Sequence, residues 1–326
     1  MRDAFGRGGR RAGRLGRAAL LSALVPALVA GPAGPAAAEV VVFTAQLLPS
    51  LETPPITNAE ADAFGTAVVT LDVARDAGGA VTGATARFDV GLSRFPDGEV
   101  VNGAHVHQGA PGMPGPIVLS GGITAGNAVP VTGDTVFTRA SLTVDPALAS
   151  SILADPTGFY FNVHTNLNPD GAVRGQLSRS PAFEGLALGV FTDAARYGPG
   201  DPIQLKAFVG NFGGTPVTAD VFAGFGLPAD QGAALCGAAG DLPLFFVGAA
   251  GTGLECFSAL ALTPPPLLAR SLTIPPFPLT PFTLFSGVVP PGTLPGTFFA
   301  FLGAAAPGTF PAGALKVDTQ RFPVGP

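Results

Sequence analysis

Hydrophobic and polar residues alternate along most of the chain between residues 39 and 179. In residues 80–92, for example, Phe88, Val90 and Leu92 alternate with polar or small residues. A period of two residues is typical of a β-strand with one buried face, because successive side chains point to opposite sides of a sheet. The pattern predicts strands at 40–47, 64–73, 80–92, 100–107, 116–120, 136–144, 158–165 and 172–177.

One helix interrupts these strands, at residues 146–153. Asp145 is suited to cap its N-terminus, and Pro146 stands at the first helical position, where its missing N–H is not needed. Turn signals separate the strands, as in the run Asn168-Pro169-Asp170-Gly171. Short, regularly spaced strands with little helix predict an antiparallel sandwich or flattened barrel.

After a short junction at residues 178–181, histidine disappears and proline and phenylalanine become more frequent. Residues 186–191, 203–211 and 218–227 alternate like the strands of an immunoglobulin-like sandwich, and 292–302 with 314–317 are expected to close its second sheet. We therefore expect an all-β protein with two tandem antiparallel β-sandwich domains. Five phenylalanines are predicted to fill the second core: Phe282, Phe285, Phe298, Phe299 and Phe301.

The first 38 residues have the features of an export signal. Six arginines precede an apolar run at 18–30, which is too short to span a bilayer, and three alanines end at Ala38. We expect cleavage before Glu39 and a protein that is secreted, periplasmic or held at the cell surface. The predicted organisation is a signal peptide at 1–38, a first domain at 39–180 and a second domain at 181–326.

Cleavage would also change the charge of the protein. Removing six arginines and Asp3 from 17 basic and 22 acidic residues leaves 11 and 21, a net charge of −10. A lysine-poor, acidic surface has no electrostatic footprint for nucleic acid. No second long apolar segment follows, so we expect no integral membrane segment after cleavage, and the expected partner is an extracellular protein or surface component.

Cys236 and Cys256 are the two cysteines of the chain. An even number of cysteines in an exported domain is more often a disulfide than a pair of reactive thiols. We therefore predict a Cys236–Cys256 disulfide, which would contribute about 3 kcal/mol by loop closure.

All three histidines lie in two strand-like segments. His105 and His107 are two residues apart and therefore share one face of their strand, and His164 shares a face with Tyr160 and Asn162. Two imidazoles at this spacing plus a third from a neighbouring strand match the geometry of three-histidine zinc or copper sites. Asp97, Asp170 or Tyr160 is available as a fourth ligand.

The same histidines have a structural interpretation. His105 and His107 with Asn162 and Gln176 are able to form a buried hydrogen-bonded network that fixes strand register. Ring nitrogens more than about 6 Å apart would rule out a shared ion, given metal–nitrogen bonds of about 2 Å. Arg174 shares a face with Gln176, and we expect it to form a surface ion pair with Asp170 or Glu99.

The two histidine segments also carry a family resemblance. The run Ala104-His105-Val106-His107-Gln108-Gly109 resembles the hydrophobic-His-hydrophobic-His-x-Gly signature of the CHRD domain, and residues 158–177 resemble the closing motif of that domain. The resemblance covers residues 40–179 and implies a β-sandwich module of the kind found in chordin, an extracellular protein that binds growth factors. The His-Val-His strand is also similar to that of copper/zinc superoxide dismutase, but the chain lacks histidines for a second metal.

No sequence motif for catalysis was found. There is no Gly-x-Ser-x-Gly and no glycine-rich phosphate loop leading into a helix. We therefore expect a non-enzymatic extracytoplasmic binding or structural protein with no obligatory cofactor. The alternative is a copper- or zinc-binding, or metal-dependent redox, protein that uses His105, His107 and His164.

Overall fold

The computed structural model describes residues 38–183, 185–228, 231, 244–249, 254–257, 266–276, 281–309 and 315–325. The predicted signal peptide lies outside this range except for Ala38, so its cleavage stays a prediction. The boundary between two domains at residue 180 likewise stays a prediction.

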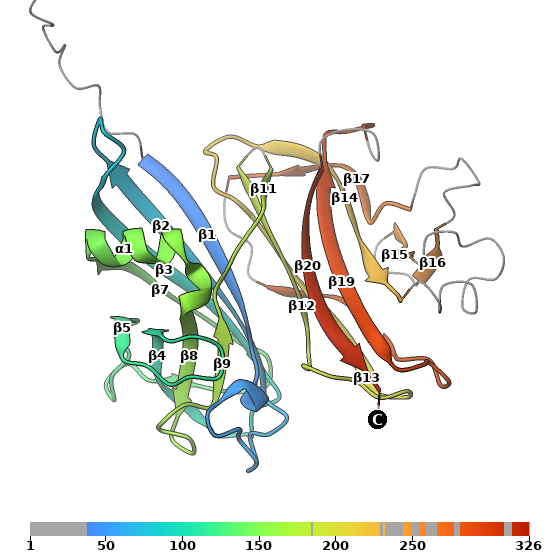
Figure 1. Ribbon diagram of the computed structural model, residues 1–326, viewed down its shortest axis with the longest axis horizontal. Coiled ribbons are helices and arrows are strands. Elements are labelled where there is room, and N and C mark those ends of the chain that lie inside the picture. Colours follow the sequence, from blue (N-terminus) through green and yellow to red (C-terminus); the bar gives the residue numbers. More distant parts are fainter. Residues whose placement is uncertain are drawn as a thin grey trace, which may run out of the picture. The chain divides into compact units, whose positions relative to one another are not determined.

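Two antiparallel sheets form the first sandwich (Figure 1). One sheet has the order β10-β1-β2-β3-β7, and the other has the order β5-β4-β8-β9 with β6 also paired to β4. The strands of the first sheet are β1 (Ala38–Leu47), β2 (Phe64–Arg75), β3 (Val81–Ser93), β7 (Thr135–Val144) and β10 (Ser178–Arg179). Those of the second are β4 (Val100–Gln108), β5 (Ile117–Ser120), β6 (Val129–Pro130), β8 (Phe159–Thr165) and β9 (Val173–Gln176).

Alternate residues of both sheets fill the core between them. Phe88 of β3 and Phe161 of β8 are fully buried, and their rings meet edge to face with centroids 5.0 Å apart. Ala104 and Val106 of β4 belong to the same core cluster and are also fully buried. Because these two residues point inward, their neighbours His105 and His107 point to the other face of the sheet.

Helix α1 (Pro146–Ala154) packs beside β3 and buries Ala149 and Ile152 in this core (Figure 1). The Asp145 carboxylate accepts hydrogen bonds from the backbone N–H groups of Ala147 and Leu148, at 2.8 and 3.2 Å. The predicted helix and its N-cap are therefore confirmed. Two short 3-10 helices, η1 (Pro49–Leu51) and η2 (Pro156–Gly158), lie in the loops before β2 and β8.

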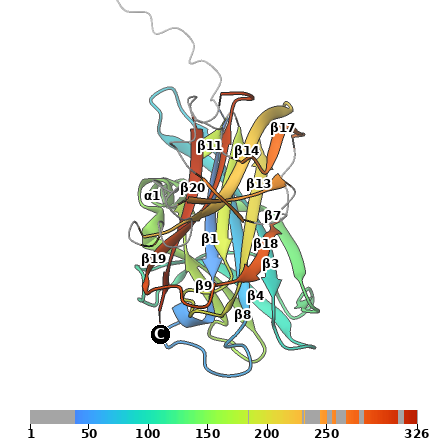
Figure 2. The same cartoon turned by 90° about the vertical axis from the view of Figure 1, so that its right-hand side faces the viewer.

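The second half of the chain is also an antiparallel sandwich, whose β14-β19-β20 sheet is visible in Figure 2. One sheet runs β11 (Ala182–Phe183), β12 (Leu186–Thr192), β13 (Pro202–Asn211) and β18 (Phe282–Val288). The other contains β14 (Val217–Gly226), β15 (Leu244–Val247), β16 (Leu254–Cys256), β17 (Ala269–Ile274), β19 (Gly296–Ala305) and β20 (Leu315–Val324). The predicted all-β, antiparallel sandwich class is confirmed, and the immunoglobulin likeness stays a prediction.

The predicted phenylalanine core of this sandwich is correct only in part. Phe298 and Phe301 are buried, whereas Phe282 is 41% exposed. Phe282 begins β18, which is the edge strand of its sheet, and a residue there has no strand on one side to cover it. Phe285 and Phe299 are partly buried at the margins of two clusters.

Within the described residues, no helix is both long and apolar enough to cross a membrane. Cys256 ends β16, and Cys236 lies outside the described residues, so the disulfide between them stays a prediction.

Candidate metal centre

Strands β4 and β8 place the three histidines on the outer face of one sheet. The antiparallel register pairs Gly103 with His164, His105 with Asn162, and His107 with Tyr160. Residues that oppose each other across two strands project to the same side of the sheet. The predicted common surface for the three imidazoles is therefore present.

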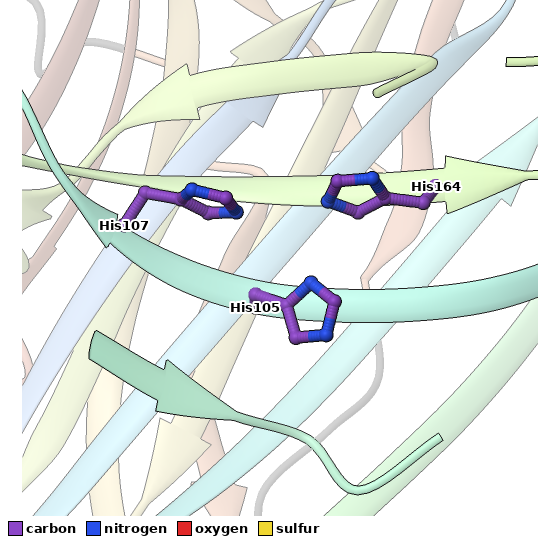
Figure 3. Close-up of side chains that lie close together, drawn as sticks. All are labelled: His105, His107 and His164. Carbon is purple, nitrogen blue, oxygen red and sulfur yellow. The ribbon is translucent and has the colours of Figure 1, made fainter. Parts of the chain in front are cut away.

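The three rings converge on one point (Figure 3). One nitrogen from each ring of His105, His107 and His164 lies within 4.8 Å of the others, and the ring centroids are 4.9–5.8 Å apart. The nitrogens thus meet the 6 Å criterion for a shared ion. Within the described part of the chain, these histidines are the one group of three or more metal-ligating side chains this close together.

Backbone carbonyls orient two of the rings. Nδ1 of His107 lies 2.9 Å from the carbonyl oxygen of Gly115, and Nδ1 of His164 lies 2.9 Å from that of Pro169. A carbonyl oxygen only accepts hydrogen bonds, so each Nδ1 carries the proton and donates it. Each Nε2 then carries a free lone pair, and a neutral imidazole with such a nitrogen is the form that binds a metal.

One buried nitrogen on each ring has no hydrogen-bond partner: Nδ1 of His105 and Nε2 of both His107 and His164. The Asn162 Oδ1 atom opposite His105 also lacks a partner. Gln176, in contrast, donates to the carbonyl oxygens of Gly109 and Thr157 rather than to a histidine. A self-contained histidine–amide network would have paired these atoms, so the structural interpretation does not account for them.

The surroundings keep all three imidazoles neutral. Burial, together with the proximity of His164 and His107, lowers the pKa of His105 to about 4. Burial also lowers the pKa values of His107 and His164, although the hydrogen bonds that their Nδ1 atoms donate to backbone carbonyls raise these pKa values in part. Neutral rings offer lone pairs at neutral pH without first losing a proton.

Tyr160 and Arg174 form a stack beside His107. The Tyr160 ring lies 4.9 Å from the His107 ring at 13°, and the Arg174 guanidinium carbon lies 3.6 Å from the centre of the tyrosine ring. Arg174 is 2% exposed and donates to the carbonyl oxygen of Met113 at 3.1 Å. The prediction of a surface ion pair with Asp170 or Glu99 was therefore wrong, because the loop after β4 covers this arginine.

That loop, residues 109–116, is held over the outer face of the sheet by its own backbone. Its Gly115 carbonyl accepts from His107, and its Gly115 N–H donates to the Tyr160 hydroxyl at 3.1 Å. Since Arg174 and Gln176 donate to the carbonyl oxygens of Met113 and Gly109, the loop is hydrogen-bonded to β4, β8 and β9. The sequence of this segment is rich in glycine and proline, but strand periodicity does not indicate where the loop folds.

The predicted carboxylate ligands are not part of the cluster. Asp97 is exposed in the turn before β4, and Asp170 is exposed in the turn after β8. Neither carboxylate belongs to the group of ligand atoms that lie within 4.8 Å of one another, which consists of the three histidine nitrogens. Tyr160 lies next to His107, but its hydroxyl accepts the Gly115 N–H and its ring face is stacked.

Glu52 is a buried carboxyl near this face that the sequence analysis did not single out. It is 8% exposed, and burial raises its pKa to about 7, while the charge of Arg174 and a hydrogen bond with Asn162 oppose the shift. A Cβ atom at Gly171 would lie 2.9 Å from both of its carboxylate oxygens. Glycine in the Asn168–Gly171 turn therefore leaves room for this carboxyl.

Comparison with known proteins agrees with the motif at the histidines. Residues 43–177 match the CHRD domain. We call this range the CHRD segment. It contains all three histidines and both sheets of the first sandwich, except β10 and the first five residues of β1. The expected CHRD module is thus confirmed, whereas no family match supports the immunoglobulin-like assignment of the second half.

The wider comparisons add little. No curated protein matches the chain. Among solved structures, Escherichia coli alpha-2-macroglobulin activated by porcine elastase is 12% identical over 90% of this chain and 34% of that one, with a TM-score of 0.21. The native conformation of E. coli alpha-2-macroglobulin is 10% identical over 88% of this chain and 22% of that one, with a TM-score of 0.20. The chain thus spans about a third or less of the length of these proteins.

Proposed function

We propose that this protein is an exported, non-enzymatic binding protein whose CHRD segment holds one zinc or copper ion through His105, His107 and His164. The observation that carries the proposal is the set of three buried ring nitrogens without a hydrogen-bond partner. Leaving a buried polar atom unpaired costs about 1–3 kcal/mol, so three in one place favour a ligand that occupies them together.

The donor set fits these metals. Three neutral imidazoles suit zinc and copper, whereas calcium and magnesium prefer oxygen ligands. Two nitrogens bound to one ion at about 2.1 Å lie at most about 4.2 Å apart. The observed separations of up to 4.8 Å therefore require the rings to close by an amount that small side-chain rotations supply. With three protein ligands, a fourth position would be left for water or another small ligand.

Location outside the cytoplasm is supported by the predicted signal peptide at residues 1–38 and by the resemblance of the CHRD segment to modules of extracellular proteins. A second candidate function follows from the same match: the segment binds an extracellular protein or surface component without metal. The orphaned nitrogens favour the metal, and the CHRD match alone is compatible with either.

Metal analysis of protein purified without a histidine tag tests the proposal. We expect one zinc or copper ion per chain after exposure to the metals, and loss of that ion in His107→Ala. Gln108→Ala is the matched control, because Gln108 is the next residue on β4 and is exposed. Absence of stoichiometric metal from the replete wild-type protein, or equal metal content in His107→Ala, would leave the metal-free binding module as the better account.

A further inference from the structure

The outer face of β4 carries a glycine in line with the histidines. Gly103, His105 and His107 are successive residues on that face, and Gly103 is paired directly with His164 across the two strands. It is buried, with the imidazole of His105 against it. No turn or left-handed backbone accounts for a glycine here, since Gly103 lies within a strand and has no positive φ.

The space beside Gly103 is occupied by imidazole. A Cβ atom built on Gly103 would lie 2.7 Å from Cε1 of His105, and 3.3 Å from both Cβ and Cδ2 of His164. Carbon atoms in van der Waals contact are about 3.5–4.0 Å apart, so His105 would have to move. Cε1 is bonded to both ring nitrogens, and its displacement therefore shifts the ligand atom whichever nitrogen binds the metal.

We infer that Gly103 is a positioning residue: the lack of a side chain there lets the His105 and His164 rings approach closely enough to share an ion. The inference rests on the proposed metal function and adds a determinant of affinity that is not itself a ligand. Glycine is unfavourable within a strand compared with residues that have a side chain. Glycine at position 103 thus makes the strand less stable locally, but a methyl group there would push His105 and His164 apart.

The test compares Gly103→Ala with Gly83→Ala by titration of Zn²⁺ and Cu²⁺ into tag-free protein. Gly83 lies within β3 of the facing sheet, and a Cβ there meets nothing within 4 Å. We expect Gly103→Ala to bind both ions about 10- to 100-fold more weakly, the size of effect typical of groups that orient ligands. Gly83→Ala is expected to bind within twofold of wild type, and both variants are expected to melt within a few degrees of wild type without metal.

A second comparison keeps the test decisive if Gly103→Ala does not fold. In a His105→Ala background the methyl group has no Cε1 atom to displace, so adding Gly103→Ala should change neither the melting temperature nor the residual affinity by more than about threefold. If wild type and Gly103→Ala both bind metal with equal affinity, this inference alone is overturned. Wild type that binds no metal overturns the proposed function as well. Loss of folding in both backgrounds assigns Gly103 a purely structural role and also overturns the inference.

Discussion

The guanidinium carbon of Arg174 lies 3.6 Å from the centre of the Tyr160 ring, and that ring is in turn stacked on His107. The stacking depends on a planar cation, which lysine does not provide. We expect Arg174→Lys to lower the free energy of unfolding by about 1–2 kcal/mol, because it loses both the stack and the hydrogen bond to Met113.

Chemical denaturation of the metal-free protein measures this effect. Arg179→Lys is the matched control, since the Arg179 side chain is 54% exposed and lies 3.5 Å from Glu39. A surface substitution of this kind should change stability by less than about 0.5 kcal/mol. Equal effects of the two variants would show that the buried stack has no energetic importance.

Metal binding should raise the thermal stability of the folded protein. At a free metal concentration 100 times the dissociation constant, a ligand that binds only the folded state stabilises it by about 2.7 kcal/mol. We expect the melting temperature to rise on addition of Zn²⁺ and to return on addition of a chelator. In His164→Ala, the same Zn²⁺ should produce a much smaller rise, whereas a rise as large as that of wild type would place the ion elsewhere.

Glu52 should make stability depend on pH. Its pKa is about 7 in the folded protein against 4.5 ordinarily, so between these values the folded protein keeps a proton that the unfolded chain has lost. The free energy of unfolding therefore falls as the pH rises from 4.5 to 7. We expect Glu52→Gln to remove this dependence and to be more stable than wild type at pH 8 by at most about 3 kcal/mol.

Urea unfolding of metal-free protein at pH 5, 6, 7 and 8 measures the Glu52 contribution. Asp62→Asn is the control, because Asp62 is exposed. The control should follow the wild-type pH profile. A Glu52→Gln profile parallel to that of wild type would contradict the assigned role of this carboxyl.

The N-cap of α1 should contribute measurably to the first sandwich. Asp145 accepts two backbone hydrogen bonds in the first turn, and replacing such a cap by alanine typically costs about 1 kcal/mol. We expect this loss in Asp145→Ala. Ser150→Ala on the same helix should be neutral or slightly stabilising, since Ser150 is exposed and alanine is the better helix former. A loss in both variants would point to helix packing instead of capping.

The alternation of residue types was enough to locate the strands and the shared face of the histidines. The predicted strand at 64–73, for instance, is observed at Phe64–Arg75, and the i, i+2 spacing places His105 and His107 together in any strand. The approach of His164 to these two residues depends on the pairing of β4 with β8, and no local pattern encodes which strands become neighbours.

Other features of the site have no signal in strand periodicity. Arg174 looks like a surface residue along the chain, yet it is buried, because its guanidinium stacks on Tyr160 and donates to Met113 in the loop after β4. Glu52 precedes β2 in a loop, and its burial likewise depends on a contact with a distant turn at Gly171. Gly103 was in reach of sequence reasoning, since it stands two residues before His105 on the same face, where most strand residues carry a side chain.

Main-chain carbonyl groups, those of Gly115 and Pro169, fix the tautomers of two histidines. Any amino acid would supply the same oxygen, but a Cβ atom at Gly115 would overlap the backbone carbonyl of Gln108, so the path of the loop requires glycine there. Substitutions at other loop positions would therefore leave the nitrogen that faces the centre unchanged, provided that Gly115 is retained and the loop backbone keeps its path.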